Sequence, residues 1–408
     1  MKKHILPQKR FFLLTMVALC ITGQVFAQEQ VYQLQNSGFE NWEGVQYNSR
    51  KGEEPINWSS FMTMTGNFIT VPFAAYEQVT KNTDSHSGNY SAYIFARDVS
   101  GIAIAQGNLT TGCINGGSTT ASDGANNYNY TNENVKGQAM YFTGRPDAMR
   151  VWLKGKTKET TKISAYLHEK GYYQDPNDKN TDKLVGLIAS AAGTPNITAD
   201  WALYTVDFDY ASEDRPYYAL ISFATCSTPG GGSASDYMYI DDVEMIYNSE
   251  LAKATYNGEE IVFEDGKGTV DALYDEEKLA LTSNGVAANI ETSFDEAEAV
   301  LTVTVKGDNI SEDPTNQHIY TIQFKKYLKG DANGDGKVTI TDAVAVVNYI
   351  LNTTQAKFIK SAADIDSNGE ITITDAVGIV NIILNSSSEP AAVKERRATE
   401  TSTEKDPE

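Results

Sequence analysis

Residues 331–352 read DANGDGKVTITDAVAVVNYILN, and residues 364–385 read DIDSNGEITITDAVGIVNIILN. Thirteen of the 22 aligned positions are identical, which is far beyond chance for segments this short. Each copy begins with acidic and amide residues at alternate positions and then follows the apolar spacing of an amphipathic helix. The sequence therefore predicts a duplicated loop–helix unit, and this repeat decides the fold of the C-terminal region.

Both loops carry oxygen ligands at the spacing of a calcium-binding loop. Gly336 and Gly369 occupy loop position 6, where the chain turns sharply and a Cβ would interfere. Position 7 contributes a backbone carbonyl, and the other ligand positions contribute side chains. The predicted ligands are Asp331, Asn333, Asp335, Lys337, Thr339 and Asp342 in the first loop, and Asp364, Asp366, Asn368, Glu370, Thr372 and Asp375 in the second. We therefore expect two Ca²⁺ ions in this region.

The repeat departs from a standard EF-hand in two ways. Position 12 is Asp rather than Glu. Residues 320–324 alternate like a strand shortly before the first loop, so no entering helix fits there. Each unit is therefore predicted to be a loop plus one helix, and the two apolar stripes should pack on each other. The predicted stripes are Val344, Val347, Ile350 and Leu351 in the first helix, and Val377, Val380, Ile383 and Leu384 in the second.

A duplicated half-EF-hand of this kind resembles a type I dockerin, and the resemblance covers residues 327–387. It implies an all-α, calcium-dependent domain that docks onto a cohesin-type module. It also implies that loop positions 10 and 11 and the following helix face contact the partner. Those residues are Ile340, Thr341 and Asn348 in the first copy, and Ile373, Thr374 and Asn381 in the second. Because the copies match, docking in two orientations is expected.

Residues 1–27 have the pattern of a secretory signal peptide: basic residues, a short apolar run and a small-residue cleavage site. Cys20 raises a lipoprotein alternative, but the preceding Leu19 is larger than the residue that such processing prefers. The apolar run is too short to span a bilayer, and no later stretch qualifies. We expect export to the extracellular space, the cell surface or the periplasm.

The net charge of −21 disfavours binding to nucleic acid or to anionic membrane surfaces. Cys113 and Cys226 remain after removal of the signal peptide. The sequence is compatible with a disulfide between them and with two free thiols. The histidines form no H-E-x-x-H pattern, and no Cys/His spacing suggests zinc.

Residues 28–249 contain short alternating runs broken by Gly, Asn, Ser and Pro, a pattern typical of an all-β sandwich. The motifs, in order, are NSGFENW at 36–42, PINW at 55–58, HSGNYSA at 86–92, TG at 111–112, RPD at 145–147 and YIDDVE at 239–244. Together they resemble the PCMD family, a carbohydrate-metabolism domain of secreted Bacteroidetes proteins, and jelly-roll carbohydrate-binding modules. The resemblance implies a glycan-associated jelly roll without established catalytic residues.

In similar jelly rolls the opening Glu and the closing Asp hold a structural calcium, which implies such a role for Glu40 and Asp241. A solvent-facing Glu and a turn Asp are an equal alternative. Residues 106–137 form a long polar segment, and loops of this length are usually functional or disordered. Aromatic rings stack on sugars, so the candidate glycan platforms are Tyr128, Tyr130, Trp42, Trp58, Tyr172 and Tyr173. For the tryptophans, a packing role is favoured over a glycan-binding one.

Residues 250–326 alternate more strictly and fit a small immunoglobulin-like sandwich that acts as a spacer. Residues 388–408 are rich in Ser, Glu, Lys, Thr and Pro, and are expected to be disordered. The predicted chain is therefore multidomain: a signal peptide, a jelly roll, a spacer, a dockerin-like domain and a tail.

These features favour an exported, non-catalytic modular protein that binds glycan or polysaccharide and docks onto a cohesin-type partner. One alternative is a glycoside hydrolase carrying a dockerin, which needs two carboxylates facing each other across a cleft. The candidate pairs are Glu40 with Glu43, Asp207 with Asp209, and Asp241 with Asp242, but strand neighbours point to opposite faces. Another alternative is an adhesin-like structural protein.

Overall fold

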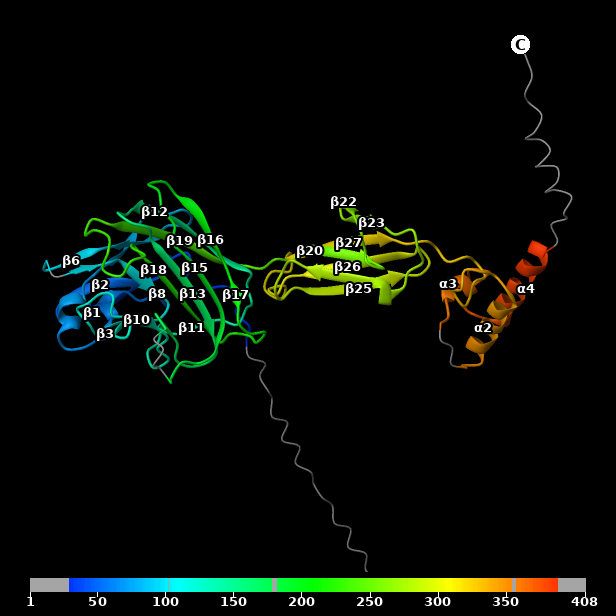
Figure 1. The fold of residues 1–408 in the computed structure, drawn as a ribbon, viewed down its shortest axis with the longest axis horizontal. Helices are drawn as coiled ribbons and strands as arrows, with labels where there is room; N and C mark the ends of the chain where they lie inside the picture. Colours follow the sequence, from blue (N-terminus) through cyan, green and yellow to red (C-terminus); the bar gives the residue numbers. More distant parts are fainter. Residues whose placement is uncertain (1–28, 102, 178–181, 354–356, 388–408) are drawn as a thin grey trace, which may run out of the picture. The chain divides into compact units, whose positions relative to one another are not determined.

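A computed structural model of the chain describes residues 29–101, 103–177, 182–353 and 357–387. Strands fill the N-terminal and central regions, and the longer helices lie near the C-terminus (Figure 1). The predicted β-rich multidomain architecture with a helical C-terminal region is thus confirmed. The predicted signal peptide and the predicted disordered tail lie outside the described residues.

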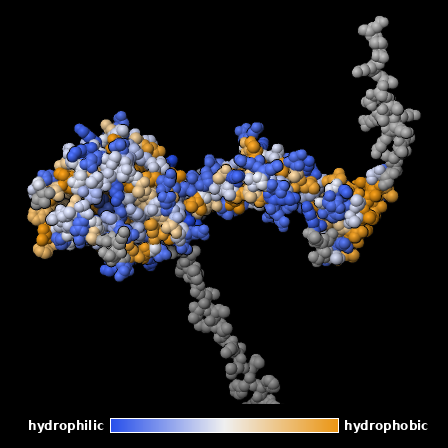
Figure 2. Space-filling model, in the orientation of Figure 1, coloured by the Kyte–Doolittle hydropathy of each residue, from blue (hydrophilic) through white to orange (hydrophobic). Residues whose placement is uncertain are grey.

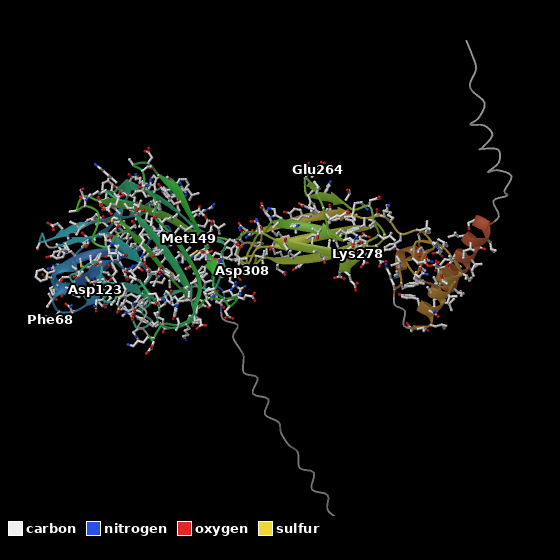
Figure 3. The ribbon with its side chains drawn as sticks, viewed as in Figure 1. Phe68, Asp123, Met149, Glu264, Lys278 and Asp308 are labelled. Carbon is white, nitrogen blue, oxygen red and sulfur yellow. The ribbon has the colours of Figure 1, made fainter. Side chains whose placement is uncertain are left out.

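Two large antiparallel sheets form a sandwich in the N-terminal region. Sheet I has the strand order β16 (Ala202–Asp207), β12 (Ala148–Lys156), β19 (Tyr237–Ile246), β5 (Ser91–Phe95) and β4 (Val79–Asn82). Sheet II has the order β11 (Met140–Tyr141), β18 (Tyr218–Ala224), β13 (Lys162–His168), β15 (Leu187–Gly193) and β17 (Asp209–Tyr210), with β8 (Asn108–Thr110) also paired to β18. Their apolar side chains form one core, and Met149 of β12 lies within it (Figure 3).

The two sheets differ in how many faces they bury. Along β12 and β19, buried and partly exposed residues alternate, as expected when one face is covered. Along β18, six consecutive residues after Tyr218 are all buried. The second face of sheet II is therefore covered as well.

Sheet III provides that cover. It consists of β14 (Gln174–Asp175), β10 (Asn127–Tyr130), β9 (Cys113–Gly116) and β3 (Thr65–Gly66). Polar side chains join it to sheet II: Asn129 Nδ2 donates to Ser222 Oγ at 2.8 Å, and Tyr166 Oη donates to Asp175 Oδ1 at 2.9 Å. The segment 106–137, expected to be one long loop, instead contributes β8, β9 and β10. Its strands could not be foreseen because their pairing partners are remote in sequence.

Short elements complete this region. They are the hairpin of β1 (Trp42–Tyr47) and β2 (Arg50–Pro55), the hairpin of β6 (Arg97–Val99) and β7 (Ala103–Ala105), the helix α1 (Thr70–Ala74) and the 3₁₀ turn Phe61–Thr63. Cys113 and Cys226 are both buried and free, so the alternative of two thiols holds.

Two smaller sheets form the next unit, which has its own core. The first contains β21 (Glu259–Glu260), β20 (Leu251–Tyr256) and β24 (Leu279–Ser283); the second contains β22 (Phe263–Glu264), β23 (Lys267–Thr269), β27 (Gln317–Gln323), β26 (Val300–Lys306) and β25 (Asn289–Asp295). A 3₁₀ turn spans Glu276–Lys278. Leu301, Val303 and Val305 alternate with polar residues on β26 and are fully buried, as their spacing predicts.

The C-terminal repeat forms α2 (Ile340–Ile350) and α4 (Ile373–Ser387), each directly after one loop, with the one-turn helix α3 (Lys360–Ala363) before the second loop. The predicted unit of a loop plus one helix thus gains a short entering turn in its second copy. Both long helices contribute to one core, centred on Val346 of α2 and Ile379 of α4, which are fully buried.

The predicted apolar stripes are only half buried. Val347, Val380 and Ile383 pack against the core. In contrast, Val344 of α2 and Leu351, which directly follows α2, are 51% and 68% exposed, and Val377 and Leu384 of α4 are 54% and 61% exposed. Apolar residues occupy two faces of each helix, and small alanines line part of the buried one. The spacing of apolar residues alone does not show which of the two faces is buried. The apolar face that stays exposed produces a hydrophobic surface over α2 and α4 (Figure 2).

His168 is buried at the contact between sheets II and III. We therefore expect the stability of the β domain to fall at acidic pH. Burial lowers the pKa of His168 to about 4, and its Nε2 lies 2.8 Å from Thr131 Oγ1. The unfolded chain takes up this proton near pH 6.5, whereas the folded chain does so only near pH 4, so stability falls between these values. We expect a loss of about 2 kcal/mol from this residue between pH 7.5 and pH 5.

Urea unfolding of the full chain at both pH values measures this loss, with His168→Gln as the comparison. The glutamine stays neutral, so the β transition of the variant should lose about 2 kcal/mol less on acidification than the wild type does. Equal losses in both proteins would show that the histidine does not carry the effect.

Candidate functional site

The two C-terminal loops have the same internal hydrogen bonds. At position 1, the Asp331 carboxylate accepts the backbone N–H groups of Asp335 (3.0 Å) and Gly336 (2.8 Å). The Asp364 carboxylate accepts those of Asn368 (3.2 Å) and Gly369 (2.8 Å). The glycines adopt φ values of +86° and +84°, a left-handed conformation that costs glycine little. The two loops therefore have the same backbone conformation because they have the same residues at these positions.

At position 12, each carboxylate also begins a helix. Asp342 accepts the N–H of Thr339 at 2.8 Å and forms a capping box with it at the start of α2. Asp375 accepts the N–H of Thr372 at 2.9 Å in the same way. Both aspartates are buried. Although burial opposes ionisation, backbone N–H groups, first that of Thr372, hold the pKa of Asp375 below its usual value.

The remaining predicted ligands line the same turns. Asp335 accepts the N–H of Lys337, and Asn368 accepts that of Glu370. Asn333 and Asp366 accept N–H groups two residues further along their loops. In the second loop, ligand oxygens of Asp364, Asp366 and Asp375 all lie within 4.8 Å of one another. Carboxylates this close repel unless a cation lies between them, and an all-oxygen donor set of this kind fits Ca²⁺.

The residues expected to contact a partner form two matching exposed patches. Ile340 is 60% exposed and Ile373 is 64% exposed, a high value for isoleucine. Thr341, Thr374 and Asn381 are exposed as well, whereas Asn348 is half-buried. Both copies therefore present an apolar residue and a hydroxyl at the start of their helix.

A cleft of about 350 Å³ lies between sheets II and III in the N-terminal region. Apolar side chains from α1, the β6–β7 hairpin and β9 line most of it, together with Phe61 and Met64. Polar groups enter from the sheets: Asn129, Ser222 and the pair of Lys162 and Asp175, whose Nζ and Oδ2 atoms are 2.7 Å apart. Phe68, beside α1, is 87% exposed and lies at the edge of the domain (Figure 3).

Three of the predicted glycan platforms come together beside this cleft. Tyr128 lines it, and its ring centroid lies 5.7 Å from that of Tyr130. Tyr172 lies 5.6 Å from Tyr130 on the other side. Burial raises the pKa of Tyr130 to about 12, so its hydroxyl stays protonated at neutral pH. The sequence could not show that Tyr172 belongs to the same group.

The other predicted platforms lie inside the fold. Trp58 is buried between Phe39 and Phe223. Tyr173 is buried and stacks on His168 at 5.1 Å. Neither ring is available to a glycan, because each side chain faces the interior of a strand-rich core. This agrees with the packing role favoured for Trp58 and corrects the prediction for Tyr173. Trp42 is half-buried and packs against the same core.

Glu40 and Asp241 both accept hydrogen bonds from the loop of residues 86–90. Glu40 Oε1 accepts the N–H groups of Asn89 (2.7 Å) and Tyr90 (3.0 Å). Asp241 Oδ2 accepts those of His86 (2.8 Å) and Ser87 (3.3 Å). The two acids thus connect the start and the last strand of the domain through one loop. A calcium ion at this point stays a prediction.

Residues 329–384 match the family model of the Dockerin type I domain, which confirms that resemblance of the C-terminal repeat. A comparison with curated proteins gives no match to this sequence.

Among solved structures, the N-terminal β region resembles carbohydrate-binding modules and glycoside hydrolase-like folds. A candidate glycoside hydrolase from Bacteroides thetaiotaomicron is 15% identical over 54% of this chain and 73% of its own, with a TM-score of 0.37. A family 61 carbohydrate-binding module solved with β-1,4-galactotriose is 12% identical over 52% of this chain and 96% of its own, with a TM-score of 0.23. A family 11 module from Clostridium thermocellum is 10% identical over 50% and 95%, with a TM-score of 0.23.

Within the described residues, no helix is long and apolar enough to cross a membrane.

Proposed function

We propose that this chain is an exported, non-catalytic modular protein that binds carbohydrate through its N-terminal β domain and docks onto a cohesin-type module through its C-terminal repeat. Dockerin domains bind calcium. The main support for the proposal is the pair of loops, in which oxygen ligands recur at the same positions. Each loop is followed by a helix whose first residue is an exposed isoleucine. We infer two Ca²⁺ ions, one for each loop.

Calcium supports docking by making the helices stable. The position 12 carboxylates cap α2 and α4, and in the second loop that of Asp375 also faces Asp364 and Asp366. A bound cation offsets that repulsion, so its binding free energy becomes folding free energy of the helical unit. The exposed faces of the helices are then held in place for a partner.

The duplication supports docking in two orientations. Ile340 and Ile373 have nearly equal exposure, as do Val344 and Val377. A half-turn that exchanges the copies would present the same apolar groups to one partner surface. An exported protein, found outside the cell or at its surface, would meet such a partner there.

The cleft supports carbohydrate binding rather than hydrolysis. Glycoside hydrolysis uses two carboxylates on opposite sides of the scissile bond. Among the described residues that line the cleft, Asp175 is the one carboxylate, and it is bonded to Lys162 and Tyr166. Tyr128 offers an aromatic face on which a sugar ring can stack.

Removing the position 1 ligands should abolish the response to calcium. In the full chain with Asp331→Ala and Asp364→Ala, we expect the unfolding of the helical unit to be the same with calcium and with a chelator. In the wild type, calcium should raise the midpoint of that transition markedly. Differential scanning calorimetry measures both, with the exposed Asp271→Ala as an acidic control outside the loops. A calcium response retained by the double variant would refute the ligand assignment.

Docking should survive the loss of either exposed isoleucine alone. Ile340→Ala leaves the second copy intact and Ile373→Ala leaves the first, so each variant should bind a type I cohesin within about threefold of the wild type. The combination should weaken binding by at least about tenfold. Titration calorimetry against a panel of type I cohesins measures this in calcium. A tenfold loss from one single variant would show that docking uses one orientation.

The cleft should lose glycan affinity when its aromatic face is removed. Tyr128→Ala should lower the affinity for the best-bound glycan of an array by at least about fivefold, because the loss of a ring contact costs about 1 kcal/mol. Tyr349→Ala, on the exposed face of α2, is the matched control and should bind the glycan normally. Equal affinity of the Tyr128 variant and the wild type would remove the cleft from the proposal.

A further inference from the structure

The solvent face of sheet I carries a block of aromatic side chains that no sequence motif marks. Along β19, Met238 and Ile240 are buried in the core, whereas Tyr237 and Tyr239 point the other way and are partly exposed. Tyr93 on β5 lies directly opposite Tyr239. This face, unlike that of sheet II, is not covered by a further sheet of the described structure.

The block extends across three neighbouring strands. Phe95 lies opposite Tyr237, next to the pair of Tyr93 and Tyr239. The ring centroids of Tyr93 and Tyr239 are 4.8 Å apart, and that of Tyr237 is 5.6 Å from Tyr93. Lys154 of β12 lies opposite Tyr239, with its Nζ 4.9 Å from the ring centroid. Four aromatic rings therefore form one surface.

Two tryptophans continue this surface beyond Lys154. Trp201 lies 6.2 Å from Tyr239, and its ring is 5.1 Å from Lys154 Nζ. Trp152 of β12 stacks against His86 at 3.7 Å with an interplanar angle of 12°. His86 in turn lies 6.1 Å from Trp201. The rings thus form an unbroken row from Trp152 to Phe95.

One end of the row opens into a hollow of about 300 Å³. Its walls are the rings of Tyr93, Phe95 and Tyr237, and its polar side is formed by Ser235 and Asp236. The Asp236 carboxylate accepts the N–H groups of Lys158 at 3.0 Å and Ser233 at 2.8 Å, which fixes its position. The hollow is therefore a shallow, open depression with aromatic and polar sides.

The polar groups of the row are available to a ligand. The hydroxyls of Tyr93, Tyr237 and Tyr239 form no hydrogen bond with another described residue. Trp201 contributes only its ring, because its Nε1 is shielded from solvent. The charged groups are satisfied: Lys154 pairs with Asp84, and Arg150 pairs with Glu244 at 2.7 Å. The face therefore offers ring surfaces and neutral donors, with its charges already paired.

We propose that this aromatic row, from Trp152 to Phe95, binds an extended neutral polysaccharide at a second site separate from the cleft. The C–H faces of successive sugar rings stack on the aromatic rings, and the phenol groups bond sugar hydroxyls. A protein partner is less suited, because Leu203 at the edge of the sheet is the one exposed aliphatic residue opposite this row. The inference rests on the proposed carbohydrate binding and extends it to another surface.

Affinity electrophoresis of the full chain in gels containing soluble polysaccharides tests this site. The probes are β-glucan, xylan, galactan and mannan, with anionic pectin for comparison. Tyr239→Leu keeps an apolar side chain but removes the ring, and we expect it to weaken binding to a neutral probe by at least about tenfold when combined with Trp152→Ala. Tyr239→Phe keeps the ring and should stay within about threefold of the wild type.

Arg150→Ala is the matched control, since Arg150 lies on the same face of β12 as Trp152 but pairs with Glu244 and is not one of the aromatic rings. Unfolding midpoints of all variants confirm that they fold, and Tyr93→Leu replaces any variant that does not. Loss of binding in the ring variants alone supports the second site and refutes the cleft. Loss in Tyr128→Ala alone refutes the second site and leaves the proposed function standing. Binding of pectin in preference to every neutral probe, or of no probe at all, overturns the proposal.

Discussion

The helical unit depends on carboxylates that perform two opposed tasks. Asp342 and Asp375 are buried where they cap α2 and α4, and in the second loop the oxygens of Asp375 also lie within 4.8 Å of those of Asp364 and Asp366. Backbone N–H groups satisfy part of this charge, as the lowered pKa of Asp375 shows. The remainder calls for a cation, because close carboxylates raise one another's free energy when all are ionised. Helix start, loop geometry and ion binding are therefore one requirement, and the sequence encodes it twice.

In the β domain, two acids bind the backbone of a loop instead of starting a helix. Glu40 and Asp241 bind backbone N–H groups of one loop and join the two ends of the domain chain. The layers differ in a similar way. Sheet II is covered on both faces, and the imperfect fit between sheets II and III leaves the cleft. Sheet I is covered on one face, so its alternation places tyrosines and a tryptophan on the other. One sandwich thereby provides two chemically different surfaces.

The sequence predicted what short-range chemistry determines. The loops were predictable because ligand spacing, a position 6 glycine and a helix start all lie within a dozen residues, and the strand alternation of β26 was predictable for the same reason. What depends on distant partners was not. Trp58 and Tyr173 resemble platforms in sequence but lie in the core, and residues 106–137 form strands only because β18 and β14 lie beside them. The exposed halves of the helix stripes were missed because spacing counts apolar residues without stating which face is covered.

Two weak carbohydrate sites on one domain act together when a single polymer reaches both. The first contact makes the second intramolecular, so the overall affinity exceeds that of either site without any new interaction. The same reasoning applies to the proposed docking, which would hold the chain at one place and raise the local concentration of its binding surfaces. An individual ring contact contributes only about 1 kcal/mol, and a binding surface needs several such contacts to hold a hydrated polymer. The two kinds of repetition therefore act differently: the aromatic rings add modest contacts along one surface, whereas the two loop–helix copies offer a partner two equivalent faces.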